Sequence, residues 1–410
     1  MASSNTFVIV GGGLAGAKAL EALRDNDFDG QILLFADETH LPYERPPLSK
    51  EYLAGKKSLT DFTVRNSDWY FGQKVDLRLG SRVSSLDPAA HTVELHDGTT
   101  ASYDELLLAT GSASRRPPIP GSDADGVHYL RSYDDAELLN SVLTEGSSLA
   151  VVGAGWIGLE VAAAARQRGV AVTVVEAAKQ PLAAALGETV GEVFANLHRD
   201  HGVDLRLQAQ VEEISVADGT ATGLRMRDGS TVAADAVLVA VGAKPNVELA
   251  EQAGLSMGDG GVLVDASLRT SDPDIYAVGD IAAAEHPVFG TRIRTEHWAN
   301  ALKQPAVAAA GMLGKPGEYA ELPYFFTDQY DLGMEYAGHA PDFERVVFRG
   351  DVAGREFVAF WLGAGNRVLA GMNVNIWDVL DDVKALIRSK VRVDPDKLAD
   401  PSSPLADLLA

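Results

Sequence analysis

The sequence FVIVGGGLAG at residues 7–16 decides the fold, and LAVVGAGWIG at residues 149–158 repeats its pattern. Each is an apolar strand candidate that runs through G-x-G-x-x-G into an alanine-rich segment typical of a helix. The glycines allow a tight turn, close approach of the backbone to a pyrophosphate, and close contact between helix and strand. The helix N-terminus favours the phosphates. We therefore expect two dinucleotide sites, formed by Gly11, Gly13, Leu14, Ala15 and Gly16 and by Gly153, Gly155, Trp156, Ile157 and Gly158.

An acidic residue follows each glycine motif at the end of the next apolar strand. Glu176 comes 18 residues after Gly158, and Asp37 comes 21 residues after Gly16. A carboxylate about 20 residues past the last glycine accepts hydrogen bonds from an adenosine ribose. At Glu176 it would also repel a 2′-phosphate, which favours NADH over NADPH. The alternative is that both residues are solvated strand ends.

The two halves resemble each other well beyond the glycines: residues 75–79 (VDLRL) recur at 203–207, and from residue 97 to 111 the match has a constant offset of 131 residues. The apolar stretches 106–111 and 237–242 both end in glycine. Each copy therefore indicates a βαβ unit, then short strands around an Asp-Gly turn, then a buried strand. The repeated residues are Asp97, Gly98, Asp104 and Gly111 in the first copy and Asp228, Gly229, Asp235 and Gly242 in the second.

The first copy carries 11 extra residues, in the stretch that contains LPYERPPLSK at residues 41–50. The prolines stiffen this segment, and it presents Arg45 and Lys50. Such cations suit contact with a bound phosphate or a reactive ring. The alternative is a surface loop with ordinary solvated charges.

Composition narrows the class of protein. A chain of 410 residues is long enough for two or three domains. Its net charge of −23 argues against nucleic acid and anionic membranes as partners, and no apolar run approaches the ~18 residues of a membrane span. The early first strand leaves no space for a signal peptide, so a cytoplasmic protein is expected.

Two residue types limit the chemistry further. The chain has no cysteine, which excludes disulfides, thiolate metal sites and cysteine redox chemistry. His198 and His201 lie three residues apart, but no further ligand cluster stands near them. We expect no metal site and interpret both histidines as ordinary helix-surface residues.

The last third of the chain differs from the two repeated halves in its pattern of predicted strands and helices. Residues 274–280 (DIYAVGD) predict a short buried strand that ends at Asp280, followed by a helix through residues 281–284. Asp280 either accepts a hydrogen bond from a cofactor polyol or caps that helix. Strands are expected at residues 324–326, 345–349 and 356–361, and an amphipathic helix at residues 376–387.

With these motifs in order, the chain resembles the FAD-dependent NADH:ferredoxin reductases that serve oxygenases, and more distantly the apoptosis-inducing factors. The resemblance covers essentially the whole length. The motifs that carry it are residues 11–16, 41–50, 109–111 (ATG), 153–160, 242–246, 276–280 and 328–330 (DQY).

The resemblance implies an α/β fold with two Rossmann-like dinucleotide-binding domains of the glutathione-reductase type and a C-terminal α+β domain. It places an FAD-binding domain at residues 1–115 and 246–322, an NAD-binding domain at 116–245, and the C-terminal domain at 323–410. The first glycine motif would hold FAD and the second NADH.

It also implies roles for individual residues. Lys50 and Glu160 would form a pair beside the flavin N5 and the nicotinamide amide. The FAD would contact Asp37 through its adenosine ribose, Val83 through its adenine, Asp280 through its ribityl chain and Trp298 beside its isoalloxazine ring. The remaining cofactor-binding residues would be Arg45, Thr110, Gly111, Arg131 and Gly242.

The implied activity is transfer of electrons from NADH through FAD to a small iron–sulfur ferredoxin that feeds a monooxygenase or dioxygenase. The chain would act as a monomer or homodimer. Ferredoxins are usually acidic and so is this chain, so docking would need a local basic patch. Arg65, Arg292 and Arg294 are candidates by charge alone, and the alternative is that they are scattered solvated charges. An NADH oxidase or quinone reductase, and a redox-sensing flavoprotein, stay open as alternatives.

The sequence departs from the family pattern at two positions. Phe326 stands where the family commonly has tryptophan, which affects nicotinamide stacking and the electron exit route. Ala184 stands where the family often has an arginine that meets the NAD adenosine, which affects NADH affinity and the strictness of nucleotide choice.

Overall fold

A computed structural model describes residues 5–409, and the chain divides into two compact units. Unit 1 contains residues 5–44, 59–113 and 243–323. Unit 2 contains residues 45–58, 114–242 and 324–409. The stretch around Lys50 therefore belongs to the same unit as the second glycine motif. The division into three domains stays a prediction.

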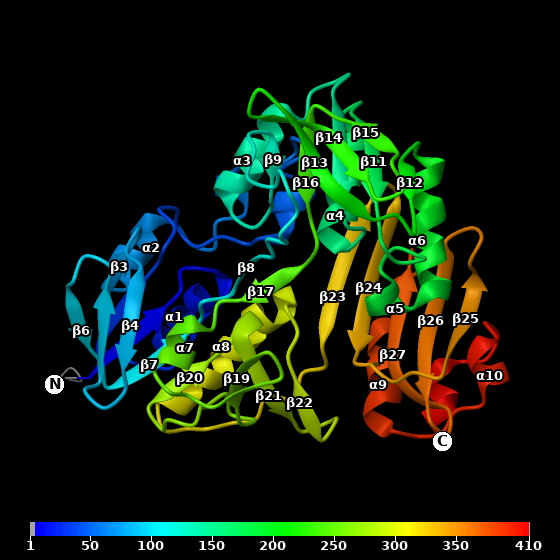
Figure 1. The fold of residues 1–410 in the computed structure, drawn as a ribbon. Coiled ribbons are helices and arrows are strands. Elements are labelled where there is room, and N and C mark those ends of the chain that lie inside the picture. Colours follow the sequence, from blue (N-terminus) through cyan, green and yellow to red (C-terminus); the bar gives the residue numbers. More distant parts are fainter. Residues whose placement is uncertain (1–4, 410) are drawn as a thin grey trace. The chain divides into compact units, whose positions relative to one another are not determined.

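Unit 1 is built on a parallel five-stranded sheet of order β20-β7-β1-β2-β3. Its strands are apolar runs, such as Val8–Val10 in β1, that are buried on both faces. Helices α1 and α8 lie side by side in this unit (Figure 1). The elements are β1 (Thr6–Val10), α1 (Leu14–Asp25), β2 (Gln31–Phe35), η2 (Leu59–Asp61), α2 (Ser67–Gly72), β3 (Val75–Arg78), β4 (Val83–Asp87), β5 (Thr92–Leu95), β6 (Thr100–Ser102), β7 (Glu105–Leu108), β17 (Ala243–Pro245), α7 (Glu248–Gln252), β18 (Met257–Gly258), β19 (Gly261–Val264), β20 (Ile275–Ala277), η3 (Gly279–Ile281), β21 (Ala282–His286), β22 (Thr291–Ile293) and α8 (Trp298–Met312).

Unit 2 repeats this sheet with the order β12-β11-β10-β16-β9, again parallel. Strand β8 (Ser112–Ser114) leads from unit 1 into unit 2. The elements are η1 (Pro46–Ser49), β9 (Val127–His128), α3 (Tyr133–Val142), β10 (Ser148–Val152), α4 (Trp156–Gln167), β11 (Ala171–Val175), α5 (Ala183–Leu186), α6 (Glu188–Asp200), β12 (Asp204–Arg206), β13 (Val211–Ala217), β14 (Thr220–Met226), β15 (Thr231–Ala233) and β16 (Ala236–Val239).

The internal repeat is confirmed at the level of single hydrogen bonds. The carboxylate of Asp104 accepts the backbone N–H of Thr6 at 2.6 Å, and that of Asp235 accepts the N–H of Ser148 at 2.8 Å. Each aspartate thereby fixes the start of its unit's central strand. A three-stranded antiparallel sheet accompanies each parallel sheet, β4-β5-β6 in unit 1 and β13-β14-β15 in unit 2.

The C-terminal part of unit 2 is an antiparallel sheet of order β23-β24-β27-β26-β25. The expected strands at residues 324–326, 345–349 and 356–361 are confirmed. Helix α9 packs against β24 and β27 (Figure 1). The elements are β23 (Tyr324–Gln329), β24 (Leu332–Gly338), β25 (Arg345–Asp351), β26 (Glu356–Gly363), β27 (Arg367–Val374), α9 (Leu380–Ser389), α10 (Pro395–Ala399) and η4 (Leu405–Leu409).

Two predicted helices are wrong in part. The helix predicted at 376–387 begins only at Leu380, because Asp378 before it has a left-handed φ of 64°. The helix predicted at 281–284 does not form: Ile281 ends the 3-10 helix η3, and Ala282–Ala284 belong to strand β21 and pair in parallel with Val262–Val264. Burial in the sheet overrides the helix propensity of alanine there. Asp280 lies inside η3, so it does not cap a helix as one interpretation proposed.

Candidate functional site

The first and last glycines of both motifs are required by the fold. Gly11 has a φ of +125°, and a Cβ there would lie 2.1 Å from the carbonyl oxygen of Ala109. Gly153 repeats this with a φ of +102° and a distance of 2.5 Å to the oxygen of Ala240. Gly16 and Gly158 hold their helices against the preceding turns, since a Cβ would lie 2.0 Å and 2.3 Å from the oxygens of Gly11 and Gly153. No other residue fits without moving the backbone.

The middle glycines have the opposite environment. A Cβ added at Gly13 or Gly155 would meet no heavy atom within 4 Å. These two residues are the N-caps of α1 and α4, and neither provides a side chain to bond the free N–H groups of the helix. Each turn is therefore an open cradle lined by backbone donors, which fits a pyrophosphate group.

The acidic residues after the motifs differ in how they are held. The carboxylate of Glu176 accepts backbone N–H groups from Ala154, inside the glycine turn, and from Ala178, each at 2.8 Å. This fixes Glu176 at the end of β11, beside the cradle. The side chain of Asp37 is 67% exposed and lies 3.5 Å from Arg82 Nη1. Both positions leave a carboxylate at the carboxyl end of a parallel strand, where nucleotides bind.

The remaining predicted cofactor residues of unit 1 lie at turns or strand ends. The hydroxyl of Thr110 donates to the carbonyl of Asn246 at 2.6 Å, and the Asn246 amide donates to the carbonyl of Thr110 at 2.9 Å. Asp280 is buried in η3, and its carbonyl accepts Arg294 at 3.1 Å. Others are Gly111, which has a φ of +65°, Val83, which is buried in β4, and Trp298, which begins α8.

Unit 2 brings together the two residues that the sequence singled out as a pair. Lys50 Nζ lies 3.1 Å from Glu160 Oε2, and the side chains are only 10% and 6% exposed. Glu160 is not in the first turn of α4, so its carboxylate is not explained by the helix dipole. A buried ion pair persists only when hydrogen bonds satisfy its other polar atoms. Here the hydroxyl of Ser49 donates to Oε2, and that of Thr327 donates to Oε1 at 2.6 Å.

The segment that presents Lys50 is anchored within unit 2. Pro46 and Pro47 begin the 3-10 helix η1, which packs against α3 and α4. The Arg168 guanidinium donates to the carbonyl of Leu53 at 2.9 Å. Arg45 donates to the carbonyl of Arg131 at 2.5 Å, which brings these two predicted cofactor residues together. Lys50 is therefore held in place, and a loop of solvated charges does not describe it.

Aromatic rings line the same region. Lys50 Nζ lies 5.3 Å from the centre of the Phe326 ring, a cation–π distance. Trp156, the residue after Gly155, packs against Phe325 with a centroid distance of 4.8 Å. Of its motif neighbours, Ile157 is 38% exposed and Gly158 is buried. Gly242 lies between strands β16 and β17 and has a φ of +105°.

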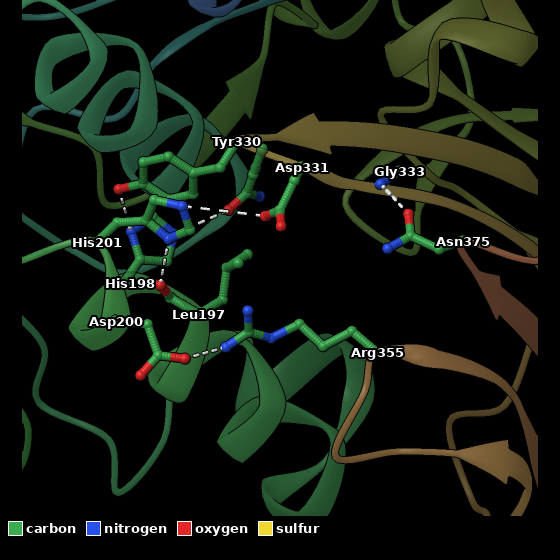
Figure 2. A network of polar contacts seen from close by, with 10 residues as sticks. Leu197, His198, Asp200, His201, Tyr330, Asp331, Gly333, Arg355 and Asn375 are labelled. Carbon is green, nitrogen blue, oxygen red and sulfur yellow. Dashed lines mark hydrogen bonds and ion pairs between the residues drawn. The ribbon is translucent and has the colours of Figure 1, made fainter.

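The sequence interpretation missed a line of buried polar residues behind Glu160. Thr327, Gln329 and His198 are 0%, 1% and 0% exposed. The prediction that His198 lies on a helix surface is therefore wrong, whereas His201 is partly exposed and stacks on Tyr330 (Figure 2). His198 follows Val190 and Phe194 at four-residue spacing, so the buried face of α6 could have indicated its position.

Burial shifts the pKa of two groups in this region. Burial lowers the pKa of His198 to about 4, more than the hydrogen bond to Gln329 raises it, so the imidazole is neutral at pH 7. Burial also raises the pKa of Asp328 above its usual range, and the charge of Lys50 opposes this.

The three arginines proposed for docking each have an acidic partner. Arg65 Nε lies 2.7 Å from Glu21, and Arg294 Nη1 lies 2.6 Å from Glu296. Arg292 pairs with Glu285. They therefore do not form a patch of unopposed positive charge.

Among residues 5–409 there is no cluster of metal-ligating side chains, and no helix there is long and apolar enough to cross a membrane.

Comparison with known proteins gives the family. The model of the pyridine nucleotide-disulphide oxidoreductases matches residues 5–305, and that of a reductase C-terminal domain matches residues 324–409. The chain belongs to the pyridine nucleotide-disulphide oxidoreductase family. The resemblance and the fold class predicted from the sequence are thereby confirmed. The cofactors of this family's ferredoxin reductases are FAD and NAD(H), as predicted.

Several members of the family match over the full length. The ferredoxin–NAD(+) reductase component of the anthranilate 1,2-dioxygenase system of Burkholderia cepacia is 41% identical, over 99% of this chain and 100% of that protein. Putidaredoxin reductase of Pseudomonas putida is 36% identical over 100% of this chain and 98% of that protein. The crystal structure of a covalent putidaredoxin reductase–putidaredoxin complex superimposes with a TM-score of 0.95 at 35% identity, covering 99% and 98% of the two chains.

Proposed function

We propose that this chain is an FAD-dependent NADH:ferredoxin oxidoreductase that supplies electrons to an oxygenase. The observation that carries the proposal is a pair of open glycine cradles in a chain that has no cysteine and that matches ferredoxin reductases from end to end. Two cradles accept two dinucleotides, and the missing cysteines leave no redox disulfide to receive the electrons. An external acceptor is then required, and the matched relatives are named for a ferredoxin.

The residues divide the work between cofactor binding and electrostatics. FAD, when bound, takes up a hydride from NADH and gives up electrons one at a time, chemistry that belongs to the cofactors. Gly13 would leave room for the FAD pyrophosphate and Gly155 for that of NADH. Glu176 would accept the ribose hydroxyls of NADH and repel the additional phosphate of NADPH.

Lys50 and Glu160 are proposed as the pair beside the reacting rings. Lys50 holds a positive charge in a position that is 90% shielded from water, where it would stabilise negative charge on a reduced ring. Glu160 keeps the ammonium in that position and would bond the nicotinamide amide. Phe326 presents an apolar face to Lys50 where the family commonly has an indole.

The reaction can be tested by anaerobic stopped-flow spectroscopy of the FAD-loaded protein. NADH should bleach the flavin absorbance, and steady turnover should require an iron–sulfur ferredoxin, with putidaredoxin and a ferredoxin from the source organism as probes. Rapid turnover with oxygen or quinone alone would contradict the proposal and favour an oxidase. A long-lived reduced complex that changes the oligomeric state would favour a redox sensor.

The proposal includes a cytoplasmic location and leaves the choice between monomer and homodimer to sedimentation measurements.

A further inference from the structure

A line of hydrogen bonds crosses unit 2 from helix α6 through strand β23 to helix α4. His198 Nε2 lies 2.8 Å from Gln329 Oε1, and Gln329 Nε2 lies 3.2 Å from Thr327 Oγ1. Thr327 Oγ1 lies 2.6 Å from Glu160 Oε1. At the other end, the hydroxyl of Tyr330 lies 3.3 Å from His198 Nδ1, as the contacts around His198 in Figure 2 show.

The alternation of β23 creates this line. Thr327 and Gln329 are two residues apart on the strand, so both side chains point to its buried face, while Asp328 points to the other face. Helices α4 and α6 each contribute one buried polar residue, Glu160 and His198. The line is shielded from water throughout, so its donors and acceptors have only each other to satisfy them.

An ionised Glu160 fixes the direction of every bond. The carboxylate can only accept, so the single hydroxyl proton of Thr327 must point to it. The oxygen of Thr327 then accepts from the Gln329 amide nitrogen, which turns the amide oxygen toward His198. A neutral imidazole must therefore carry its proton on Nε2 and donate it to the amide oxygen. Its unprotonated Nδ1 accepts a hydrogen bond from the hydroxyl of Tyr330. All donors therefore point toward the carboxylate.

The reverse direction satisfies the same groups only if Glu160 can donate. The hydroxyl of Thr327 would then donate its hydrogen bond to the amide oxygen of Gln329. The amide would rotate so that its NH₂ group donates to His198 Nε2, and the imidazole would carry its proton on Nδ1. The amide cannot pass a proton along, so the line transmits orientation and no charge.

We propose that Gln329 and His198 are positioning residues that orient the Glu160 carboxylate toward Lys50, and that the charge of Glu160 sets the tautomer of His198. The inference deepens the proposed function, because it assigns the support of the site that function would use. Burial of His198 keeps its imidazole neutral, as the two-tautomer scheme requires. The neighbouring groups are His201, which stacks on Tyr330, and Arg166, whose charge acts on Tyr330.

The substitution Glu160→Gln tests the coupling directly. Lys50 and Ser49 are donors that face Oε2, so the new amide would turn its oxygen to them and its NH₂ group to Thr327. The line must then reverse. In ¹⁵N spectra of histidine-labelled, FAD-loaded protein near pH 7, His198 should change from the Nε2–H to the Nδ1–H tautomer. The His201 signals provide the internal control, because that ring bonds the carbonyl of Leu197 and not Gln329.

Two further variants keep the test decisive. On a Thr327→Val background, which cuts the line and preserves side-chain shape, Glu160→Gln should no longer change the His198 tautomer. A His198 that stays Nε2–H in the single Glu160→Gln variant would overturn the proposal. This readout needs no turnover, so it separates failure of the inference from failure of the proposed function.

A kinetic arm tests the positioning role in the holoprotein. His198→Leu removes the donor that orients Gln329 and should slow flavin reduction by NADH about tenfold, the factor that one buried hydrogen bond of typical strength represents. His198→Gln places an amide donor near the position of Nε2 and should restore most of the rate. His201→Gln at the C-cap of the same helix should have no effect. Equal losses in His198→Leu and His198→Gln would contradict the orienting role.

Discussion

At the scale of single residues, the space beside a glycine separates its structural role from its ligand-binding role. Gly11 and Gly153 are surrounded by backbone atoms, whereas Gly13 and Gly155 face open space. Alanine at Gly13 should therefore leave the apoprotein as stable as the wild type and weaken FAD binding, because the new methyl occupies the pyrophosphate cradle. Thermal unfolding of the apoprotein and fluorescence titration with FAD measure the two effects.

The matched control is Gly11→Ala. Its Cβ would meet a carbonyl oxygen at 2.1 Å with a left-handed φ, so the fold itself should lose stability by several kcal/mol. The same contrast should hold for NADH between Gly155→Ala and Gly153→Ala. Equal losses of stability at Gly11 and Gly13 would disprove the division of roles.

His198 should make unit 2 sensitive to acid. Its pKa is lowered from 6.5 to about 4 in the folded chain, so below pH 6.5 the unfolded chain binds a proton that the folded chain does not. The stabilisation is complete above pH 6.5 and is lost as the pH falls toward 4, amounting to about 2 kcal/mol by pH 5. Urea unfolding at pH 7.5 and pH 5 should show this loss in the wild type and a loss smaller by that amount in His198→Gln. An identical pH dependence in both proteins would rule out a neutral, buried His198.

Single-residue roles were predictable only where a motif carried them. Lys50 and Glu160 stand in motifs that the resemblance aligned, and the structure brings them to 3.1 Å. Ser49 and Gln329 lie inside such motifs, but the sequence indicated no role for either of them or for Thr327. The hydrogen bonds of Ser49 and Thr327 to Glu160 span 111 and 167 residues of sequence. Such contacts depend on tertiary packing, which periodicity does not encode.

At the scale of elements, strands with strong apolar runs were predictable and alanine-rich segments were not. Strand β10 was expected at residues 149–152 and spans Ser148–Val152. Ala282–Ala284 were expected as a helix, yet they form part of β21, because pairing with β19 buries them completely. The start of α9 was placed too early, because Asn375 and Asp378 both adopt left-handed conformations that stop a helix from forming. Local propensity is weak wherever sheet pairing competes with it.

The end of strand β11 is where nucleotide choice should be decided. Two backbone N–H groups hold the Glu176 carboxylate beside the glycine turn. Glu176→Gln retains an acceptor for the ribose and removes the charge that repels a 2′-phosphate, so the NADH/NADPH ratio of kcat/KM should fall by about tenfold or more. Asp37→Asn is the matched control at the equivalent strand end of unit 1, and it should leave the ratio unchanged. A ratio unchanged by Glu176→Gln would place the discrimination elsewhere.

At the scale of the whole molecule, the same kind of parallel five-stranded sheet occurs in both units, and the two sheets differ in the origin of one strand. The sheets of both units have equivalent strand orders, and Asp104 and Asp235 start them with the same hydrogen bond. Their fifth strands differ in origin: β20 comes late in the chain and β9 early. The internal repeat of the sequence predicted the shared part, because the glycine turn, the Asp-Gly turn and the aspartate before the last strand recur in the same order in both copies. It could not predict the fifth strands, which lie outside the repeated segment.

The overall charge of −23 gives the last prediction, on the rate of encounter with an acidic iron–sulfur protein. Like charges slow the encounter, and the arginines first considered for docking are each paired with a glutamate. Raising the salt from 0.01 to 0.15 M shortens the Debye length from about 30 to about 8 Å. The second-order rate of ferredoxin reduction should therefore rise over this range, measured by stopped flow with pre-reduced enzyme.

A neutral quinone acceptor is the control, because its rate should not depend on salt. A ferredoxin rate that falls as salt is added would reveal a local basic docking surface that outweighs the net charge. Arg292→Glu and Arg294→Glu would then show whether these residues belong to it, by raising the apparent KM for ferredoxin while flavin reduction by NADH is unchanged. A rising rate instead means that partner choice depends on shape and apolar contact at the docking surface, since attraction over long distances does not bring the two proteins together.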